Sequence, residues 1–252
     1  MRRAAFALAL VVALPAAADA PARVVSTNLC TDQLAMLVAA PGQLVAVSRV
    51  ARDPVSSAMA AEAAAYPAHG GGAEEILLLG PDLVLAGAHD RPATLDLLRR
   101  LGVRVETFPL ERDFDDVRAN LARMGALLGR EDRAAELIAA FDAAIAAPPP
   151  EGPPPRAALL YANAWSSGAA TLADAALRAA GLANVAAEAG GTGMLRLPLE
   201  ALVLAAPDLV VTGQDYATPA RAQEILHHPA AGALDAARVA VADNLWVCGT
   251  PH

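Results

Sequence analysis

Residues 74–87 read EEILLLGPDLVLAG and residues 200–213 read EALVLAAPDLVVTG, and this pair of matching stretches indicates the fold. Each begins with an acidic residue and an apolar run, which predicts a short helix whose positive N-terminal end favours a carboxylate. A Pro-Asp pair ends the helix, and an apolar strand then runs to a glycine. A strand without polar alternation is typical of a parallel sheet covered by helices on both faces. One copy in each half predicts two similar lobes.

The flanking sequence supports two α/β lobes of the Rossmann-like kind. Strands are predicted at residues 23–26, 44–48, 103–108 and 157–161, and helices at residues 31–39 and 92–101. Alternating strands and helices favour βαβ units with parallel sheets. Between the halves, residues 114–128 and 131–146 predict two helices, the second roughly 24 Å long, which is enough to bridge two domains.

The chain divides into five predicted segments. A positive start, an apolar run that is too short to span a bilayer, and small residues after Pro15 predict an export signal cleaved after Ala18 or Ala20. The predicted segments are a signal peptide at 1–20, an N-terminal lobe at 21–112, bridging helices at 113–147, a proline-rich linker at 148–156 and a C-terminal lobe at 157–252. We therefore expect an exported protein.

Composition narrows the functional class. The formal net charge of −8 argues against nucleic acid as a partner, because neutralising phosphates needs clustered Lys and Arg. A chain with two cysteines is not a disulfide scaffold, so the fold has to rest on its own core.

Two lobes with Glu-x6-Pro-Asp-Leu-Val in each, a helical bridge, and the segment Arg23-Val-Val-Ser-Thr-Asn-Leu resemble the substrate-binding proteins of ABC importers for cobalamin, ferric siderophores and haem. The resemblance covers roughly residues 23–252. It implies a periplasmic monomer with a ligand cleft between the lobes, no cofactor and no catalytic activity, and an inner-membrane permease with its ATPase as partners. It also implies a further helix after His252, so we expect the chain to lack its last helix.

The resemblance implies that Glu74 and Glu200, one on each lobe, dock against arginines of the permease. The alternative is that each glutamate is an ordinary acidic residue in the first turn of a helix, where its charge stabilises the helix by about 0.3–1 kcal/mol. Because the glutamate occurs at the same place in both copies, docking is the preferred interpretation.

The predicted ligand site follows from the topology, because ligands of such folds sit where loops leave the carboxyl ends of the strands. This rule selects Asn28, Cys30, Thr31, Arg49, Arg52, His69, Gly70, His89 and Arg91 in the first lobe, and Asn163, Trp165, Met194, Arg196, Gln214, Tyr216, Trp246 and Cys248 in the second. Aromatic faces suit a flat macrocycle or chelate, and arginines match carboxylates at its rim. Alternatively, a tryptophan in a loop packs on its own lobe.

The cysteines allow three interpretations. Cys30 and Cys248 are free buried thiols, ligands of a soft metal or haem, or an inter-lobe disulfide. The disulfide ranks last, because a bond across the cleft would lock the lobes and oppose ligand entry. No metal site is firmly predicted, and the histidines show no ligand spacing.

Two other functional classes compete with a binding protein. Residues 69–72, HGGG, imitate the oxyanion-hole sequence of esterases, but no Gly-x-Ser-x-Gly elbow is present to supply the nucleophile. A scaffold or interaction protein without a small ligand is the other alternative.

Overall fold

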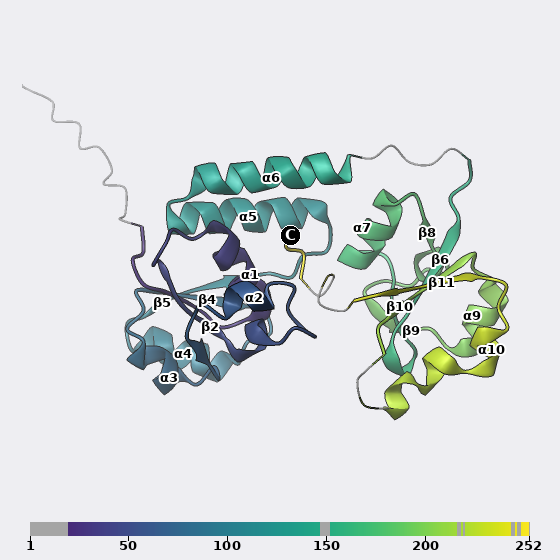
Figure 1. Cartoon of the computed structure of the whole chain (residues 1–252), viewed down its shortest axis with the longest axis horizontal. Coiled ribbons are helices and arrows are strands. Elements are labelled where there is room, and N and C mark those ends of the chain that lie inside the picture. The colour runs from purple at the N-terminus through teal and green to yellow at the C-terminus, as the bar shows by residue number, and fades with distance from the viewer. Residues whose placement is uncertain are drawn as a thin grey trace, which may run out of the picture.

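The computed structural model describes residues 20–146, 152–215, 218, 220–242, 245 and 248–251. They form two α/β lobes, with a pair of long helices lying over the first lobe (Figure 1). The predicted fold of two lobes with parallel sheets is confirmed. Residues 1–19 of the predicted signal peptide, residues 148–151 of the predicted linker, Tyr216 and Trp246 lie outside the described residues. None of the described helices combines the length and the apolar character that a membrane span needs.

The N-terminal lobe contains a five-stranded parallel sheet of order β3-β2-β1-β4-β5. Its strands are β1 (Val24–Ser26), β2 (Leu44–Ser48), β3 (Ala68–His69), β4 (Leu83–Gly87) and β5 (Arg104–Phe108). Its helices are α1 (Leu29–Val38), α2 (Ala60–Ala63), α3 (Ala73–Leu78) and α4 (Pro92–Arg100), with a 3-10 turn η1 (Arg49–Arg52). The sheet is buried on both faces: Val24 and Leu85 belong to the cluster around α1, and Val84 packs with Ile76 of α3 and Leu98 of α4.

The C-terminal lobe repeats this plan with a four-stranded parallel sheet of order β11-β10-β6-β8. Its strands are β6 (Arg156–Leu160), β8 (Ala183–Asn184), β10 (Leu209–Gly213) and β11 (Ala237–Val241). Its helices are α7 (Leu172–Ala179), α8 (Val185–Glu188), α9 (Leu199–Ala205) and α10 (Pro229–Gly232), with 3-10 turns η2 (Ala162–Ala164) and η3 (Arg221–His227). A separate antiparallel pair, β7 (Trp165–Ser167) and β9 (Met194–Arg196), was not predicted, because strands of three residues show no periodicity.

The sequence repeat has the same structural role in both lobes. The Asp82 carboxylate accepts hydrogen bonds from the backbone N–H groups of Ala22 and Arg23, at 2.7 and 3.0 Å, and thereby fixes the start of β1. The Arg23 guanidinium donates to the carbonyls of Leu79 and Gly80 at the end of α3. A cation is favourable there, because the carbonyl end of a helix is negative.

Asp208 and Arg156 repeat this clamp in the second lobe. The Asp208 carboxylate accepts from the Arg156 backbone N–H at 2.7 Å, and the Arg156 guanidinium donates to the carbonyl of Ala205 at the end of α9. Each Pro-Asp pair therefore joins a helix, the strand that follows it and the first strand of its lobe.

Two long helices follow the first sheet along the chain, α5 (Phe114–Leu128) and α6 (Glu131–Ile145), and their apolar faces pack in the core cluster around α1. Asp113 caps α5 by accepting from the Asp116 N–H at 2.9 Å, and Gly129 ends it at φ 64°, a left-handed conformation that suits glycine. The helices lie side by side, with Phe114 and Phe141 in edge-to-face contact at 5.4 Å between ring centroids.

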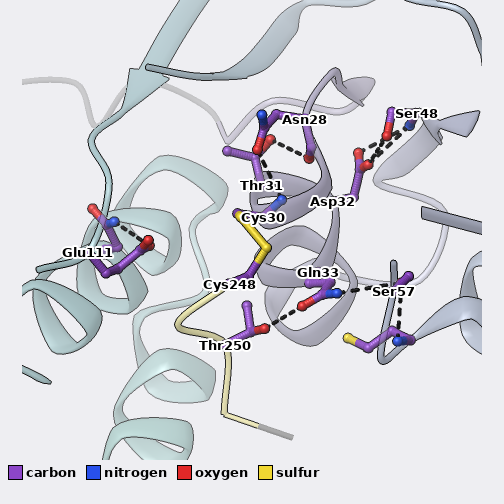
Figure 2. Close-up of a disulfide and its surroundings, with 12 residues drawn as sticks. Asn28, Cys30, Thr31, Asp32, Gln33, Ser48, Ser57, Glu111, Cys248 and Thr250 are labelled. Carbon is purple, nitrogen blue, oxygen red and sulfur yellow. Dashed lines mark hydrogen bonds between the residues drawn. A yellow bond between two sulfur atoms is a disulfide. The ribbon is translucent and has the colours of Figure 1, made fainter. Parts of the chain in front are cut away.

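The C-terminal segment corrects the prediction for the cysteines. Cys30 and Cys248 form a disulfide with Cα atoms 5.2 Å apart, and Thr250 Oγ1 is hydrogen-bonded to the side-chain oxygen of Gln33 (Figure 2). Ranking the disulfide last of the three interpretations was therefore wrong. That ranking assumed that Cys248 belongs to the rim of the second lobe. The chain after β11 instead returns to the first lobe, where Cys248 is buried in the core around α1.

We predict that the variant with Cys30→Ser and Cys248→Ser is less stable by about 2–5 kcal/mol, because the bond closes a long loop and restricts the unfolded chain. Urea unfolding with and without dithiothreitol measures the effect. Reductant is expected to lower the midpoint of the wild type to that of the variant and to leave the variant unchanged. Equal midpoints for both proteins without reductant would contradict the prediction.

A buried carboxyl group lies beneath the same helix. Asp32 on α1 is fully buried and accepts hydrogen bonds from the backbone N–H of Ser48, at 3.2 Å to each oxygen, and from the Ser48 hydroxyl (Figure 2). Burial raises the pKa of Asp32 to about 7, against the opposing effect of these bonds.

Because the pKa of Asp32 is higher in the folded than in the unfolded state, its protonated form stabilises the fold below about pH 4, and this contribution is lost as the pH rises to about 7. We therefore predict that the free energy of unfolding of the wild type, minus that of Asp32→Asn, falls between pH 4 and 7 and then levels off. Urea titrations across this range check the slope. Asp235→Asn, which changes an exposed aspartate, serves as control, and a flat difference for Asp32→Asn would refute the assignment.

Candidate functional site

The largest cavity described, about 770 Å³, lies between the loop that follows β5 and the second lobe. Its volume is within the range of pockets for drug-sized ligands. Its lining is mostly apolar and carries one acidic and one basic side chain. It consists of Leu110, Glu111, Arg112, Tyr161, Ala162, Trp165, Ser167, Ala170, Thr171, Leu172, Ala173, Gly193, Met194, Gly213, Gln214, Gln223, Leu226 and Gly249.

The antiparallel pair β7–β9 carries Trp165, an aromatic residue of the cavity lining. Trp165 lies opposite Arg196 in the register of the two strands, and the Arg196 guanidinium carbon is 5.2 Å from the centroid of the Trp165 ring. The positively charged Arg196 side chain is attracted to one face of the Trp165 indole and covers it. Trp165 keeps 41 % of its surface exposed, so a ligand in the cavity can contact the rest.

The turn before Trp165 is strained. Asn163 and Ala164 have φ values of 55° and 58°, the left-handed region that non-glycine residues rarely adopt. Such conformations cost about 1–3 kcal/mol each and are found where the surrounding structure holds them in place. Here the turn carries the chain from β6 to β7 and presents Trp165 to the cavity.

A short polar chain supports the same wall. The hydroxyl groups of Tyr161 and Ser167 are 3.1 Å apart, and Ser167 Oγ donates to the Met194 sulfur at 3.3 Å. All three residues line the cavity. The two strands and the end of β6 therefore present a single connected surface.

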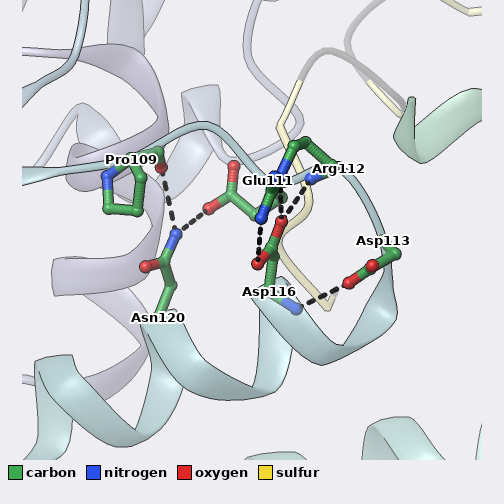
Figure 3. A network of polar contacts seen from close by, with 6 residues as sticks. All are labelled: Pro109, Glu111, Arg112, Asp113, Asp116 and Asn120. Carbon is green, nitrogen blue, oxygen red and sulfur yellow. Dashed lines mark hydrogen bonds and ion pairs between the residues drawn. The ribbon is translucent and has the colours of Figure 1, made fainter. Parts of the chain in front are cut away.

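The opposite wall is the loop between β5 and α5, whose charged side chains are held from below (Figure 3). The Asn120 amide donates to the Glu111 carboxylate at 2.6 Å and to the Pro109 carbonyl at 3.2 Å. Arg112 donates from its backbone and its Nε to one oxygen of Asp116, at 3.0 and 2.9 Å. The hydrogen bond from Arg112 lowers the pKa of Asp116 below its ordinary value. Helix α5 thus holds in place the one acidic and the one basic side chain that the described lining contains.

The first lobe contributes a smaller recess of about 30 Å³ that shares Leu110 and Glu111 with the large cavity. Four predicted residues line it: Asn28, Cys30, Thr31 and His89. Their polar groups are largely occupied within the lobe. Asn28 accepts from the Cys30 N–H at 3.0 Å and donates to Asp90 at 3.2 Å, so it is the N-cap of α1.

The structure places the predicted residues in three groups. Trp165, Met194 and Gln214 line the large cavity, with Arg196 directly behind Trp165, and Asn28, Cys30, Thr31 and His89 line the recess. Outside both cavities lie Arg49, Arg52, His69, Gly70, Arg91, Asn163 and Cys248. His69 is buried with Nε2 2.8 Å from the Ser26 carbonyl and Nδ1 accepting from Gly71. Arg49 pairs with Glu75 at 3.6 Å.

Five residues of the lining were not predicted: Leu110, Glu111, Arg112, Tyr161 and Gln223. Leu110 to Arg112 follow the predicted strand 103–108, so the rule that selects loops at the carboxyl ends of strands would have found them. Gln223 lies in η3 and carried no signal in the sequence, because it reaches the cavity only through the fold of that turn; its amide donates to the Gln214 carbonyl at 3.0 Å.

The side chains of the lining are of the kinds that bind an organic ligand. In the described parts of the chain, no group of three His, Cys, Asp or Glu side chains could hold a metal ion. The Glu111 carboxylate accepts from Asn120, the Arg112 guanidinium pairs with Asp116, and the remaining side chains of the lining are aromatic, aliphatic, hydroxyl or amide groups. Such a site suits a large, mostly apolar ligand with a few polar groups.

Glu74 and Glu200, the two predicted docking residues, lie in the first turns of α3 and α9. Both side chains are exposed, and neither forms an ion pair with another described residue. The neighbouring Glu75 differs, since it accepts from the Gly70 N–H at 2.7 Å and pairs with Arg49. Glu74 and Glu200 are therefore the carboxylates that remain free on these helices.

Comparison with known proteins gives one consistent family. The family model described as periplasmic binding protein matches residues 24–240. A cobalamin-binding protein of Halobacterium salinarum is 34 % identical over 146 residues, which cover 56 % of this chain and 40 % of that protein. The matched part thus spans about two fifths of the length of that relative.

Solved structures agree with the family. The periplasmic haem-binding protein BhuT in complex with two haems is 27 % identical, with a TM-score of 0.68 over 86 % of this chain and 88 % of BhuT. The haem-binding protein HutB of Vibrio cholerae shares the fold, at 21 % identity and a TM-score of 0.74 over 89 % of this chain and 91 % of HutB. With most of the chain matched by the family model and both lobes reproduced in solved relatives, the chain belongs to the periplasmic binding protein family.

Proposed function

We propose that this protein is the solute-binding component of an ABC importer, and that it captures a metal chelate of the cobalamin, ferric siderophore or haem kind. The observation that carries the proposal is the large, mostly apolar cavity with the partly exposed face of Trp165 in its wall. The protein has no catalytic activity of its own under this proposal, in keeping with a family of binding proteins.

A chelate fits the lining better than a bare ion or a small polar solute does. An ion needs converging charged or carbonyl ligands, whereas this lining is apolar and its charged pair is already hydrogen-bonded. A flat organic shell gains from stacking on an aromatic face, and Met194 and Leu172 supply further apolar contact. The relatives described as binding cobalamin and haem support this ligand class.

The first experiment titrates the mature protein with hemin, cyanocobalamin and ferrichrome, following binding by calorimetry and by the absorbance of the chelate. We expect one of the three to bind saturably. Trp165→Ala should weaken that binding about tenfold, equivalent to ~1.4 kcal/mol, because the stacking face is lost. Trp165→Phe keeps an aromatic ring and is the matched control, expected to stay close to the wild type.

Two results would count against this assignment. Failure of all three chelates to bind the folded protein would reject the ligand class. An unchanged affinity in Trp165→Ala would move the site away from the large cavity.

We also propose that the protein is exported, with cleavage after Ala18 or Ala20. The protein for the binding experiment is therefore taken from the periplasmic fraction, and its intact mass shows whether the chain begins at Asp19 or Pro21.

Delivery to a membrane permease is the second half of the proposal. Glu74 and Glu200 support it, since each lobe presents a free, exposed carboxylate at the same position of the sequence repeat. Permease arginines are the groups that would pair with these carboxylates, through charge-assisted hydrogen bonds.

The double variant Glu74→Ala with Glu200→Ala is expected to stop chelate uptake into proteoliposomes that hold the importer, while the affinity of the free protein for the chelate stays unchanged. Loss of two charge-assisted contacts should weaken docking at least tenfold. Glu136→Ala, an exposed glutamate on α6, is the control and should transport normally. Undiminished uptake in the double variant would contradict docking through these residues.

A further inference from the structure

Each helix that carries a free glutamate also carries a highly exposed leucine one turn later. Leu78 on α3 is 82 % exposed and Leu204 on α9 is 86 % exposed. In the same helices Ile76 and Leu202 are completely buried and hold the helix against its lobe. Burial in the core therefore does not account for Leu78 or Leu204.

The exposed leucines match in the two lobes. In the sequence repeat Glu74 aligns with Glu200 and Leu78 with Leu204, so the spacing of four residues is the same. Residues four apart lie on one face of a helix, about 5–6 Å apart. Single exposed apolar residues are common on protein surfaces. The same residue at the same place beside the same free carboxylate on both lobes is a pattern that chance exposure does not explain.

The chemistry of these two patches defines the partner. Each patch, Glu74 with Leu78 and Glu200 with Leu204, offers a carboxylate next to an aliphatic side chain. The complementary surface is a basic side chain beside a small apolar pocket. Because one chain presents the patch twice, once on each lobe, a partner that presents its complement twice, as a two-fold symmetric dimer does, matches both patches.

We infer that Leu78 and Leu204 form the apolar part of the surface that docks on the importer, each inserting into one of two equivalent apolar pockets of a dimeric permease. This inference rests on the proposed function and extends it, because the glutamates alone would give a contact that salt weakens. The leucines supply binding that does not depend on ionic strength, since it comes from removing apolar surface from water.

The test measures the affinity of the chelate-loaded protein for the importer in nanodiscs at low salt and at high salt. Leu78→Ser and Leu204→Ser are each expected to weaken docking about tenfold or more at both salt concentrations, and the double variant should be weaker than either. Glu74→Ala and Glu200→Ala should weaken it mainly at low salt. Leu101→Ser changes a leucine that is 52 % exposed outside the repeat, and it should bind within twofold of the wild type.

The outcomes separate the inference from the proposed function. If the glutamate variants weaken docking and the leucine variants do not, the inference is overturned and docking through the lobes stands. If neither set has an effect, docking through these helices is wrong altogether. Chelate affinity and thermal stability should be unchanged in every variant, and Leu78→Met with Leu204→Met should restore docking. If the wild type forms a dimer in sedimentation that the leucine variants abolish, the surface binds a second copy of this chain, which also overturns the inference.

Discussion

The architecture depends on the clamp between an arginine and an aspartate at the base of each lobe. In the first lobe, the Asp82 carboxylate accepts from the backbone N–H of Arg23. The Arg23 carbonyl in turn accepts from the backbone N–H of Asp82, at 3.0 Å. Arg156 and Asp208 make the same exchange, with the backbone bond at 2.8 Å. These contacts join residues far apart in sequence, and they set the register of the strands whose far ends carry the binding loops.

Much of this fold could be predicted from the sequence, because its determinants are local. The helix expected at residues 114–128 is α5, and the structure ends it at the Asp113 cap and at the left-handed Gly129. The repeated helix–Pro-Asp–strand unit likewise has a visible apolar pattern. The correct expectation of two parallel sheets follows from strands that show no polar alternation.

The site was harder to predict, because its parts are brought together by features without a periodic signal. Trp165 and Met194 were expected near the ligand, yet the strand pair that places them depends on two left-handed residues that nothing in the sequence marks. Glu111 is held by Asn120, nine residues along the chain, in a contact that depends on the packing of α5 under its preceding loop, whereas Arg112 reaches Asp116 only four residues on. Cys248 was assigned to the wrong lobe because the path of the chain after β11 is a tertiary property.

That disulfide has a topological consequence. It joins residues 218 positions apart, so every strand except β1 belongs to one closed covalent ring. The lobes are therefore linked twice, once through the bridging helices and once through the returning C-terminal segment. A single peptide-bond cleavage between the two cysteines opens the ring without separating the molecule into pieces. In a compartment that contains proteases, a nicked chain would keep both walls of its cavity on one covalent molecule.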